Sequence, residues 1–570
     1  MIRFIKRVLK YVALGVGVLL ILNAIPAFFY KPEINRNPLP SCYKKGVYHM
    51  HSTFSDGTGT VDQIARAAAS LNYDFTILTD HGRPNVDAAT STAWKAVESG
   101  TGKKKDVLVI GGTELSSIAG HLAAMGFETP NYLFPVEPQE EINDIRHLNG
   151  VCFLAHPFDN RTPWTNWRVN GFTGLEVYSS YNEARRAVFL NLLTFPLRYL
   201  VDSKYALLKT MHYPSDSLAK WDLLDKTGSY YGIYALDTHG ELKMGKSISL
   251  HFPTYRSMFE IMTVYVKTDG PLNRDAHHAS AEVMASLKQG KFFNAVEAIA
   301  PANGFDVCLL DEAGKRIEMG GFCQSKRGKL VIELPFDFKT DVWIIKDGSI
   351  VGRFHSNREK RLEYEVKEAG NYRVEVHVPG NPFHELPWIT SNPFFVGRDQ
   401  RTHSPDPVSG SLKGETWTPF IVEPENFRLE KNPQSAGEIF FAKSAGTEQG
   451  MGMKFKLLKS NDENDFWCSL ALRQKLDLSK YKGIGFEARS DKRQWFRVEL
   501  RTDESDPEKW YSYSFWADKE WRYVFIPFER FHVNNKEKCG IDPSRIASVF
   551  VSITNETAYP GTEGVLFLRN

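Results

Sequence analysis

Metal-binding residue types recur at the ends of short apolar runs across the first half of this chain. Each run has the length and composition of a β-strand, and histidines or acids end it or follow it. Strands that alternate with helical patterns pair in parallel, so the polar groups at their ends meet at one rim of the sheet. Nine side chains fit this pattern: His49, His51, Asp56, His81, Glu114, His121, His156, Asp237 and His239.

The spacing and the donor types of these residues predict a cluster of ions. On a regular strand, His49 and His51 would share a face while Tyr48 and Met50 turn away. Six imidazoles and three carboxylates, without a thiolate, suit Zn, Mn or Fe better than Ca. Nine ligands divided among three divalent ions would leave open positions for water and substrate, which is typical of a catalytic site.

The motifs resemble those of the PHP (polymerase and histidinol phosphatase) superfamily of metal-dependent phosphoesterases. The matching segments are His49-x-His51-Ser-x-x-Ser-Asp56-Gly, Thr79-Asp80-His81, Gly112-Thr-Glu114 with His121, Ala155-His156-Pro157 and Asp237-x-His239. The resemblance covers about residues 46–300 and is closest to the CehA/McbA-like branch. It implies a distorted (β/α)7 barrel with three divalent ions and a hydroxide that bridges two of them and attacks phosphorus, with no protein nucleophile.

The same resemblance assigns the nine ligands to individual ions. The first ion would be held by His49, His51, Glu114 and Asp237. Glu114 would also reach the second ion, together with His121 and His156, and the third would be held by Asp56, His81 and His239. Around them, Asp80 is expected to orient a histidine, and Arg83 is expected to meet the substrate.

The remaining pattern divides the chain into further units. We expect an α/β fold with a signal anchor at 1–30, a linker at 31–45, the barrel at 46–303 with a helical insertion at 179–231, a small β-sandwich at 304–400, a linker at 401–422 and a jelly roll at 423–570. The last unit resembles galactose-binding-like, carbohydrate-binding modules through 476–489, 495–501 and 521–531. Its tryptophans would stack on sugars or, as is usual for alternating aromatics, form the core.

The N-terminus predicts a membrane segment. Four basic residues precede an uncharged apolar stretch from Tyr11 to Tyr30, which is long enough to span a bilayer as a transmembrane helix. Because the basic cluster comes first, the rest of the chain should be extracytoplasmic, periplasmic or on the cell surface. A cleaved signal peptide is the rival interpretation. Of the six cysteines, Cys308 and Cys323 are the closest couple along the chain, and their pairing stays open.

Together these features predict a membrane-anchored hydrolase of phosphate esters, and a glycan- or lipid-linked ester is the substrate that we expect. A formal charge of +2 speaks against nucleic acid as the partner. Two alternatives stay open: a non-catalytic glycan-binding protein stabilised by metals, and a hydrolase of carboxylic or carbamate esters.

Overall fold

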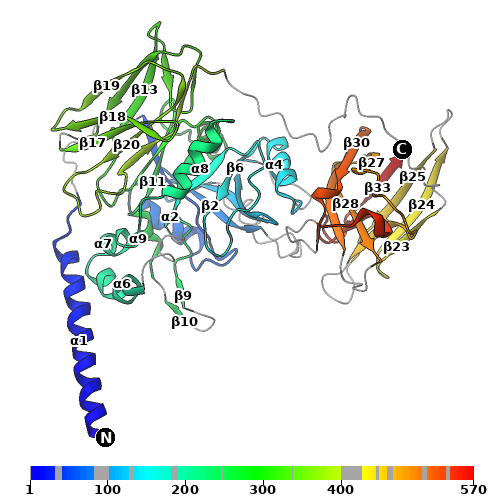
Figure 1. The fold of residues 1–570 in the computed structure, drawn as a ribbon, viewed down its shortest axis with the longest axis horizontal. Coiled ribbons are helices and arrows are strands. Elements are labelled where there is room, and N and C mark those ends of the chain that lie inside the picture. Colours follow the sequence, from blue (N-terminus) through cyan, green and yellow to red (C-terminus); the bar gives the residue numbers. More distant parts are fainter. Residues whose placement is uncertain are drawn as a thin grey trace.

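The structure is a computed structural model of the chain. It describes residues 2–32, 42–82, 102–127, 134–180, 189–244, 248–250, 252–336, 338–399, 426–443, 449–458, 466–503, 510–533 and 540–569. Figure 1 shows a long N-terminal helix, a central α/β body with an all-β unit packed on it, and a second all-β unit at the other end.

The first half of the chain forms a sheet that curls round a core (Figure 1). Its strands are β1 (Tyr43–Tyr48), β2 (Phe75–Gly82), β3 (Gly102–Lys104), β4 (Val107–Ser117), β5 (Gly120–Met125), β6 (Val151–Ala155), β7 (Gly174–Ser179), β8 (Tyr231–Ala235), β11 (Thr263–Lys267) and β12 (Phe292–Ala295). Strands β1, β2 and β4 pair in parallel, as do β6, β7 and β8. Between these two sets, β5 runs antiparallel to both β4 and β6.

The two ends of the curled sheet meet where β8 returns to β1. Met50 and Thr238 form an isolated parallel bridge, and Leu236 N donates to Tyr48 O at 3.1 Å. Two asparagine side chains help to close the remaining edge. Asn294 accepts from Tyr234 N and donates to the oxygen of Gly232, while Asn392 accepts from Gly232 N, each at 2.9 Å.

Helices cover this sheet, and α6, α7 and α8 lie between β7 and β8 in the sequence. Their bounds are α2 (Val61–Ala69), α4 (Pro138–His147), α6 (Phe189–Val201), α7 (Ser203–Leu208), α8 (Ser215–Asp225), α9 (Tyr255–Phe259) and α10 (Ala276–Lys288), and the short strands β9 (Leu242–Met244) and β10 (Ile248–Leu250) form a hairpin. Helix α2 begins with a capping box between Thr60 and Gln63, and it buries Ile64, Ala65 and Ala68 as its periodicity predicts.

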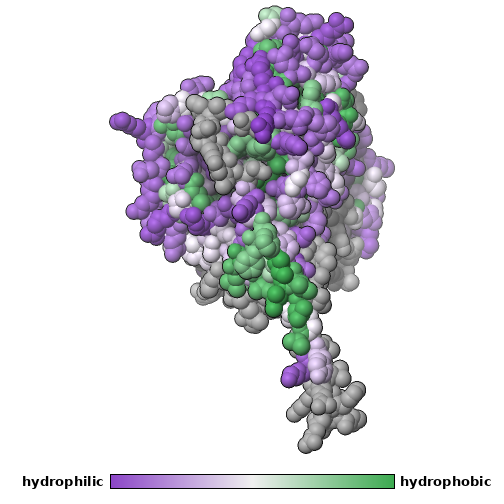
Figure 2. Space-filling model, turned by 90° about the vertical axis from the view of Figure 1, so that its left-hand side faces the viewer, coloured by the Kyte–Doolittle hydropathy of each residue, from purple (hydrophilic) through white to green (hydrophobic). Residues whose placement is uncertain are grey.

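The N-terminal helix α1 (Ile2–Phe29) does not match the expected transmembrane span. In the described part of the chain, no helix combines the length and the apolarity that a bilayer crossing requires. The end of the apolar run packs on the protein instead: Ala24 and Ala27 are buried, and Tyr30 Oη donates to Ala298 O at 2.6 Å. Earlier along α1, apolar side chains are exposed, and Figure 2 shows them projecting from the body.

An all-β unit follows the α/β body and shares its sheet. It contains β13 (Asp306–Asp311), β14 (Arg316–Glu318), β15 (Phe322–Cys323), β16 (Gly328–Glu333), β17 (Thr340–Lys346), β18 (Ser349–Ser356), β19 (Arg361–Val366), β20 (Gly370–His377), β21 (Ile389–Ser391) and β22 (Phe394–Val396). Strands β14, β13, β16 and β19 form one sheet, whereas β21 pairs with β12 and so continues the curled sheet. Cys308 and Cys323 are free thiols here.

The C-terminal module has two facing sheets and a core of its own. Its elements are β23 (Phe427–Lys431), β24 (Ala436–Lys443), β25 (Gln449–Lys456), β26 (Trp467–Leu472), β27 (Gly483–Ser490), β28 (Gln494–Thr502), β29 (Tyr511–Ala517), β30 (Arg522–Pro527), β31 (His532–Val533), β32 (Ile546–Thr554) and β33 (Glu563–Arg569), with the 3-10 turns Phe528–Arg530 and Pro543–Arg545. One sheet has the order β23-β26-β32-β28-β29-β31 and the other β24-β25-β33-β27-β30.

Candidate metal centre

Six strands and one loop bring the nine predicted ligands to one place. His49 and His51 follow β1, His81 is near the end of β2, Glu114 is in β4, His121 is in β5, His156 follows β6, and Asp237 and His239 follow β8. Asp56 comes from the loop between β1 and α2. Three groups of these side chains have ligand atoms within 4.8 Å of one another and could hold metal ions: His49, His51 and Glu114; His81, Glu114 and His121; and His51, Asp56, His81 and His239.

Glu114 is the centre of this cluster, and its side chain is only 1% exposed. Its Oε1 atom lies 2.8 Å from His121 Nδ1 and 2.9 Å from His156 Nε2. Its Oε2 atom lies 3.2 Å from His81 Nδ1, 3.3 Å from His51 Nε2 and 3.4 Å from His49 Nε2. One buried carboxylate therefore faces five imidazoles from its two oxygens.

Two further acids complete the cluster on opposite sides of His51. Asp237 Oδ1 lies 3.3 Å from His51 Nε2 and 3.6 Å from His49 Nε2. Asp56 Oδ1 lies 3.3 Å from His239 Nε2 and 3.7 Å from both His51 Nδ1 and His81 Nε2. The side chain of Asp56 is 37% exposed, so this side of the cluster opens to solvent.

The backbone at the strand ends differs from the expected alternation. Strand β1 ends at Tyr48, and His49 has a φ of 64°, so His49 and His51 do not lie on one regular strand face. Asp237 (φ 49°) and His156 (φ 28°) are also in the left-handed region, which non-glycine residues rarely adopt. Such conformations cost of order 1–3 kcal/mol each and cluster at functional sites. The turn aims both His49 and His51 at Glu114.

The donor set fits divalent ions. His51 Nε2 is buried and has no hydrogen-bond partner among the described residues, although two carboxylates lie beside it. Converging imidazole nitrogens and carboxylate oxygens are what borderline divalent cations require.

The charges of the cluster shift its pKa values strongly. Burial lowers the pKa of His51, but the adjacent carboxylates of Asp237 and Glu114 outweigh it and raise that pKa to about 10. Burial together with the neighbouring His51 and His121 lowers the pKa of His81 to about 4, against the pull of Glu114 and Asp56. Burial disfavours the charge on Glu114, yet the surrounding histidines hold its pKa well below the ordinary value.

Residues around the ligands fix their positions. Glu176 in β7 accepts from His49 Nδ1 at 2.6 Å and from His156 N at 2.8 Å. Tyr255 Oη donates to the oxygens of His51 and His239 at 2.7 and 3.0 Å. No sequence pattern indicated Tyr255, because its contact with His51 joins segments 204 residues apart.

Asp80 has partners other than the expected histidine. Its carboxylate accepts from Ser52 N and Ser52 Oγ at 2.7 Å each and from Ser55 Oγ at 2.6 Å. It therefore holds the loop that carries His51 and Asp56. Arg83, the other predicted neighbour, lies outside the described residues.

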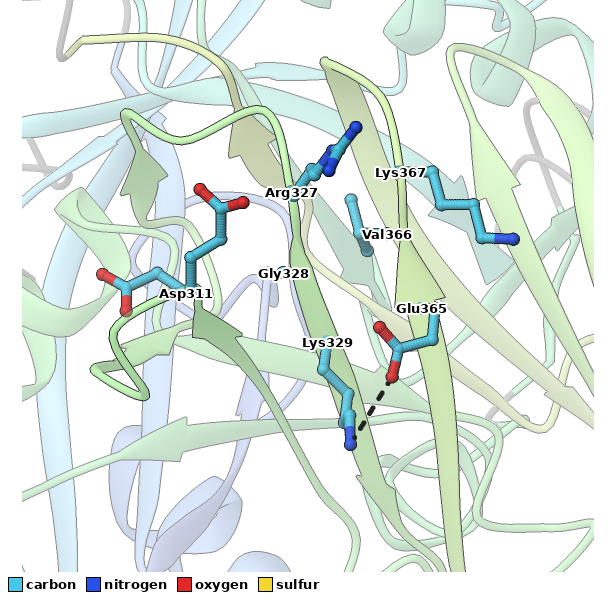
Figure 3. A pocket seen from close by; sticks show the side chains of 8 residues that line it. Asp311, Arg327, Gly328, Lys329, Glu365, Val366 and Lys367 are labelled. Carbon is cyan, nitrogen blue, oxygen red and sulfur yellow. Dashed lines mark ion pairs between the residues drawn. The ribbon is translucent and has the colours of Figure 1, made fainter.

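A separate pocket lies in the β-sandwich and contains none of the nine ligands (Figure 3). Its volume is about 530 Å³, and its lining is Asp311, Glu312, Arg327, Gly328, Lys329, Glu365, Val366 and Lys367. Lys329 and Glu365 form an ion pair across it at 3.5 Å.

Comparison with known proteins gives partial matches. Residues 459–560 match the family described as Complex I intermediate-associated protein 30 (CIA30). The chain is similar to a two-domain protein from Bacteroides vulgatus ATCC 8482 containing a predicted PHP-like metal-dependent phosphoesterase, with 14% identity over 64% of this chain and 99% of that one and a TM-score of 0.31. It is also similar to the family 11 carbohydrate-binding module from Clostridium thermocellum in complex with a β-1,3-1,4-mixed-linked tetrasaccharide, with 16% identity over 25% of this chain and 86% of that one and a TM-score of 0.20. No curated protein matches.

Proposed function

We propose that this protein is a metal-dependent hydrolase that cleaves phosphate esters, and that the curled sheet is a distorted (β/α)7 barrel of the PHP kind. The observation that carries the proposal is the buried Glu114 carboxylate, which lies within 3.4 Å of the ring nitrogens of five histidines. A purely structural site needs few ligands and closes around its ion, whereas this cluster combines nine donors with an open side at Asp56.

The residues of the cluster have distinct tasks in this proposal. Glu114 would hold two of the three ions together, since each of its oxygens faces a different set of histidines. Divalent ions bound there would supply the positive charge that makes a water molecule more acidic and stabilises a leaving oxygen. The side chains of His81 and His121 are 21% and 19% exposed, so substrate would approach from their side.

We also propose that the protein acts at a membrane surface outside the cytoplasm, on an ester attached to a glycan or a lipid. The exposed side chains of α1 support membrane association: Leu14, Ile21 and Phe28 are each more than half exposed. An apolar helix surface of this kind is unfavourable in water. Co-sedimentation of the purified chain with lipid vesicles, compared with a chain lacking residues 1–29, tests this part.

Metal analysis and an ester panel test the hydrolase proposal. The purified protein, never exposed to chelator, should contain Zn, Mn or Fe and should cleave an aryl phosphomonoester or phosphodiester. Asp237→Asn and His51→Ala should abolish turnover, whereas His278→Ala, an exposed histidine on α10, should leave it unchanged. Faster turnover of carboxylic or carbamate esters than of phosphate esters would show that the protein is not a phosphoesterase. Bound metal without turnover of any ester would indicate a metal-stabilised binding protein.

A further inference from the structure

Helix α6 exposes a leucine and buries its charge. Leu200 is 83% exposed, more than any other large apolar side chain that the structure describes. Arg198, the only charged residue of α6, is 2% exposed, and its Nε donates to Asn23 O of α1 at 3.3 Å. A helix that faces water normally exposes its charges and buries its leucines, so α6 reverses the usual arrangement at these two positions.

The exposed apolar surface continues from α6 onto α1. The two helices pack along each other, and Leu14, Ile21 and Phe28 of α1 are each more than 60% exposed. Figure 2 shows apolar side chains gathered where α1 leaves the body. Single exposed leucines are common on proteins, whereas a contiguous group of large apolar side chains marks an interaction site.

The hairpin of β9 and β10 lies on the side of the body from which α1 projects (Figure 1). Its register pairs Leu242 with Leu250 and Met244 with Ile248. Because alternate residues of a strand share a face, these four apolar residues occupy positions on one face of the hairpin. We call them, together with Leu14, Ile21, Phe28 and Leu200, the apolar surface.

The charge of the four elements favours an anionic membrane as the partner. Helices α1 and α6 and strands β9 and β10 contain no acidic residue. Their basic residues are Arg3, Lys6, Arg7, Lys10, Arg198 and Lys243. Basic residues beside an apolar helix face are typical of segments that lie in the interface of an anionic bilayer. A protein partner for an apolar face gives no reason for charges of one sign alone.

Contacts through α9 fix α6 relative to the metal cluster. Tyr199 Oη of α6 lies 2.6 Å from Ser257 Oγ of α9. In the same short helix, Tyr255 Oη donates to the backbone oxygens of His51 and His239. A membrane that contacts α6 would therefore lie at a defined position relative to the ligands.

The hairpin leaves the cluster on its open side. Strand β9 begins three residues after His239, whose Nε2 lies 3.3 Å from Asp56 Oδ1. The side chain of Asp56 is 37% exposed, so the part of the cluster nearest the hairpin is also the part that solvent reaches. Insertion of the hairpin into a membrane would bring the headgroups to that side of the cluster.

We propose that the apolar surface inserts into an anionic bilayer, and that the substrate is a phosphate ester of a membrane lipid. Interfacial segments enter a bilayer by about 5–10 Å, to the boundary between headgroups and acyl chains, and the phosphorus of a phospholipid lies in that headgroup layer. Hydrolysis would form one bond from phosphorus to the oxygen of water and break the bond to the lipid alcohol, which takes a proton. The choice of substrate rests on the proposed phosphoesterase activity, whereas the membrane contact does not.

Hydrogen exchange of the full chain tests the membrane contact without any assay of activity. Vesicles of phosphatidylglycerol and phosphatidylcholine should slow amide exchange at least 10-fold in residues 196–201, 242–244 and 248–250, relative to the chain without vesicles. Residues 276–288 of α10 should exchange at the same rate in both samples. Slowing confined to α1, or no slowing in α6 and the hairpin, would overturn the proposed contact.

Turnover of two substrates tests the choice of lipid. The ratio of phospholipid turnover in vesicles to turnover of a soluble aryl phosphate ester should fall at least 10-fold in Leu200→Asp with Ile248→Asp. Leu223→Asp is the matched control, because Leu223 is a 54% exposed leucine on α8 and does not belong to the apolar surface. Its ratio should equal that of the unmodified chain.

The two experiments separate the failure of this inference from the failure of the proposed function. Cleavage of the aryl ester without cleavage of vesicle phospholipid, or an unchanged ratio in the double variant, would overturn the lipid substrate alone. No turnover of any ester would overturn the lipid substrate together with the proposed hydrolase. The exchange rates of α6 and the hairpin would decide the membrane contact in either case.

Discussion

His49 Nδ1 lies 2.6 Å from Glu176 Oε1, and both side chains are fully buried. This contact fixes which ring nitrogen of His49 remains available, because the proton on Nδ1 points at Glu176 and Nε2 then faces Glu114 and Asp237. Glu176 also accepts from the backbone of His156, so one carboxylate positions ligands that follow two different strands.

Replacing Glu176 should weaken metal binding without removing a ligand. A carboxylate that accepts the hydrogen bond from the second ring nitrogen of a metal-bound histidine typically raises metal affinity 10–100-fold. Glu176→Gln should therefore lower the affinity for Zn or Mn by about that factor. Titration of the metal-free protein measures it. Glu282→Gln, an exposed glutamate on α10, is the control. An unchanged metal affinity in Glu176→Gln would show that the Glu176 carboxylate is not needed to position His49.

Removing the Asp80 carboxylate should loosen the loop between His51 and Asp56. Asp80→Ala deletes three hydrogen bonds to a charged group, and we expect the free energy of unfolding to fall by at least about 3 kcal/mol. Denaturant unfolding measures it. Asp62→Ala, whose side chain is 68% exposed, should change stability by less than about 0.5 kcal/mol. A loss in Asp80→Ala no larger than in this control would contradict the role of Asp80.

The hydroxyl of Tyr255 should matter more than its ring. Tyr255→Phe keeps the ring but removes the donor to the buried oxygen of His51, and losing that hydrogen bond should cost about 1–3 kcal/mol. The oxygen of His239 keeps its hydrogen bonds from Thr58. Thermal unfolding should show the loss, and metal affinity should fall with it. Tyr213→Phe, a tyrosine bonded to Glu375 away from the cluster, should leave metal affinity unchanged.

The contact between α4 and the C-terminal module, in which Tyr513 Oη donates to Glu140 Oε1, should weaken as the pH rises towards neutrality. Burial raises the pKa of Glu140 to about 7, and Glu137 adds to this against Arg522 and Arg530 and the hydroxyl of Tyr513. Since that pKa is higher when the contact is formed, the stabilisation from protonated Glu140 is complete below about pH 4.5 and is lost as the pH rises through 7.

Two other acids of α4 also have shifted pKa values, one raised and one lowered. Burial and the nearby Glu137 and Asp144 also raise the pKa of Glu141, whereas His532 and Arg497 overcome the effect of burial and lower the pKa of Glu137 to about 2. The Glu137 contribution is therefore lost only in strong acid. Amide exchange in α4, corrected for intrinsic rates, should be slower at pH 5 than at pH 8. Glu140→Gln should reduce that difference, and an equal difference in the variant would contradict the assignment.

The sequence predicted part of the strands of the α/β body, and β5 is among those that it missed. Apolar runs identified β2, β4, β6, β7 and β8 because buried parallel strands are continuously hydrophobic. Strand β5 has the sequence GHLAAM, whose glycine and alanines have weak strand propensity, so only its pairing with β4 and β6 defines it.

Local geometry and long-range contacts limited the prediction of the site. The residue types at strand ends indicated the cluster, but they did not indicate the positive φ of His49, which precedes the bridge between Met50 and Thr238. The partners of Asp80 and the contact of Tyr255 depend on loops whose path a sequence pattern does not specify. The burial of Trp495 against α4 follows from packing between segments about 350 residues apart.

The pairing of β12 with β21 has a practical consequence for anyone who truncates this protein. Cutting at residue 303 would remove β21, which pairs with one edge of β12. It would also remove Asn392, whose side chain forms hydrogen bonds with Gly232 and Phe292. The fragment would present a bare, aggregation-prone edge. Shortened chains for crystallisation or assay should therefore extend to at least Val396, where β22 ends.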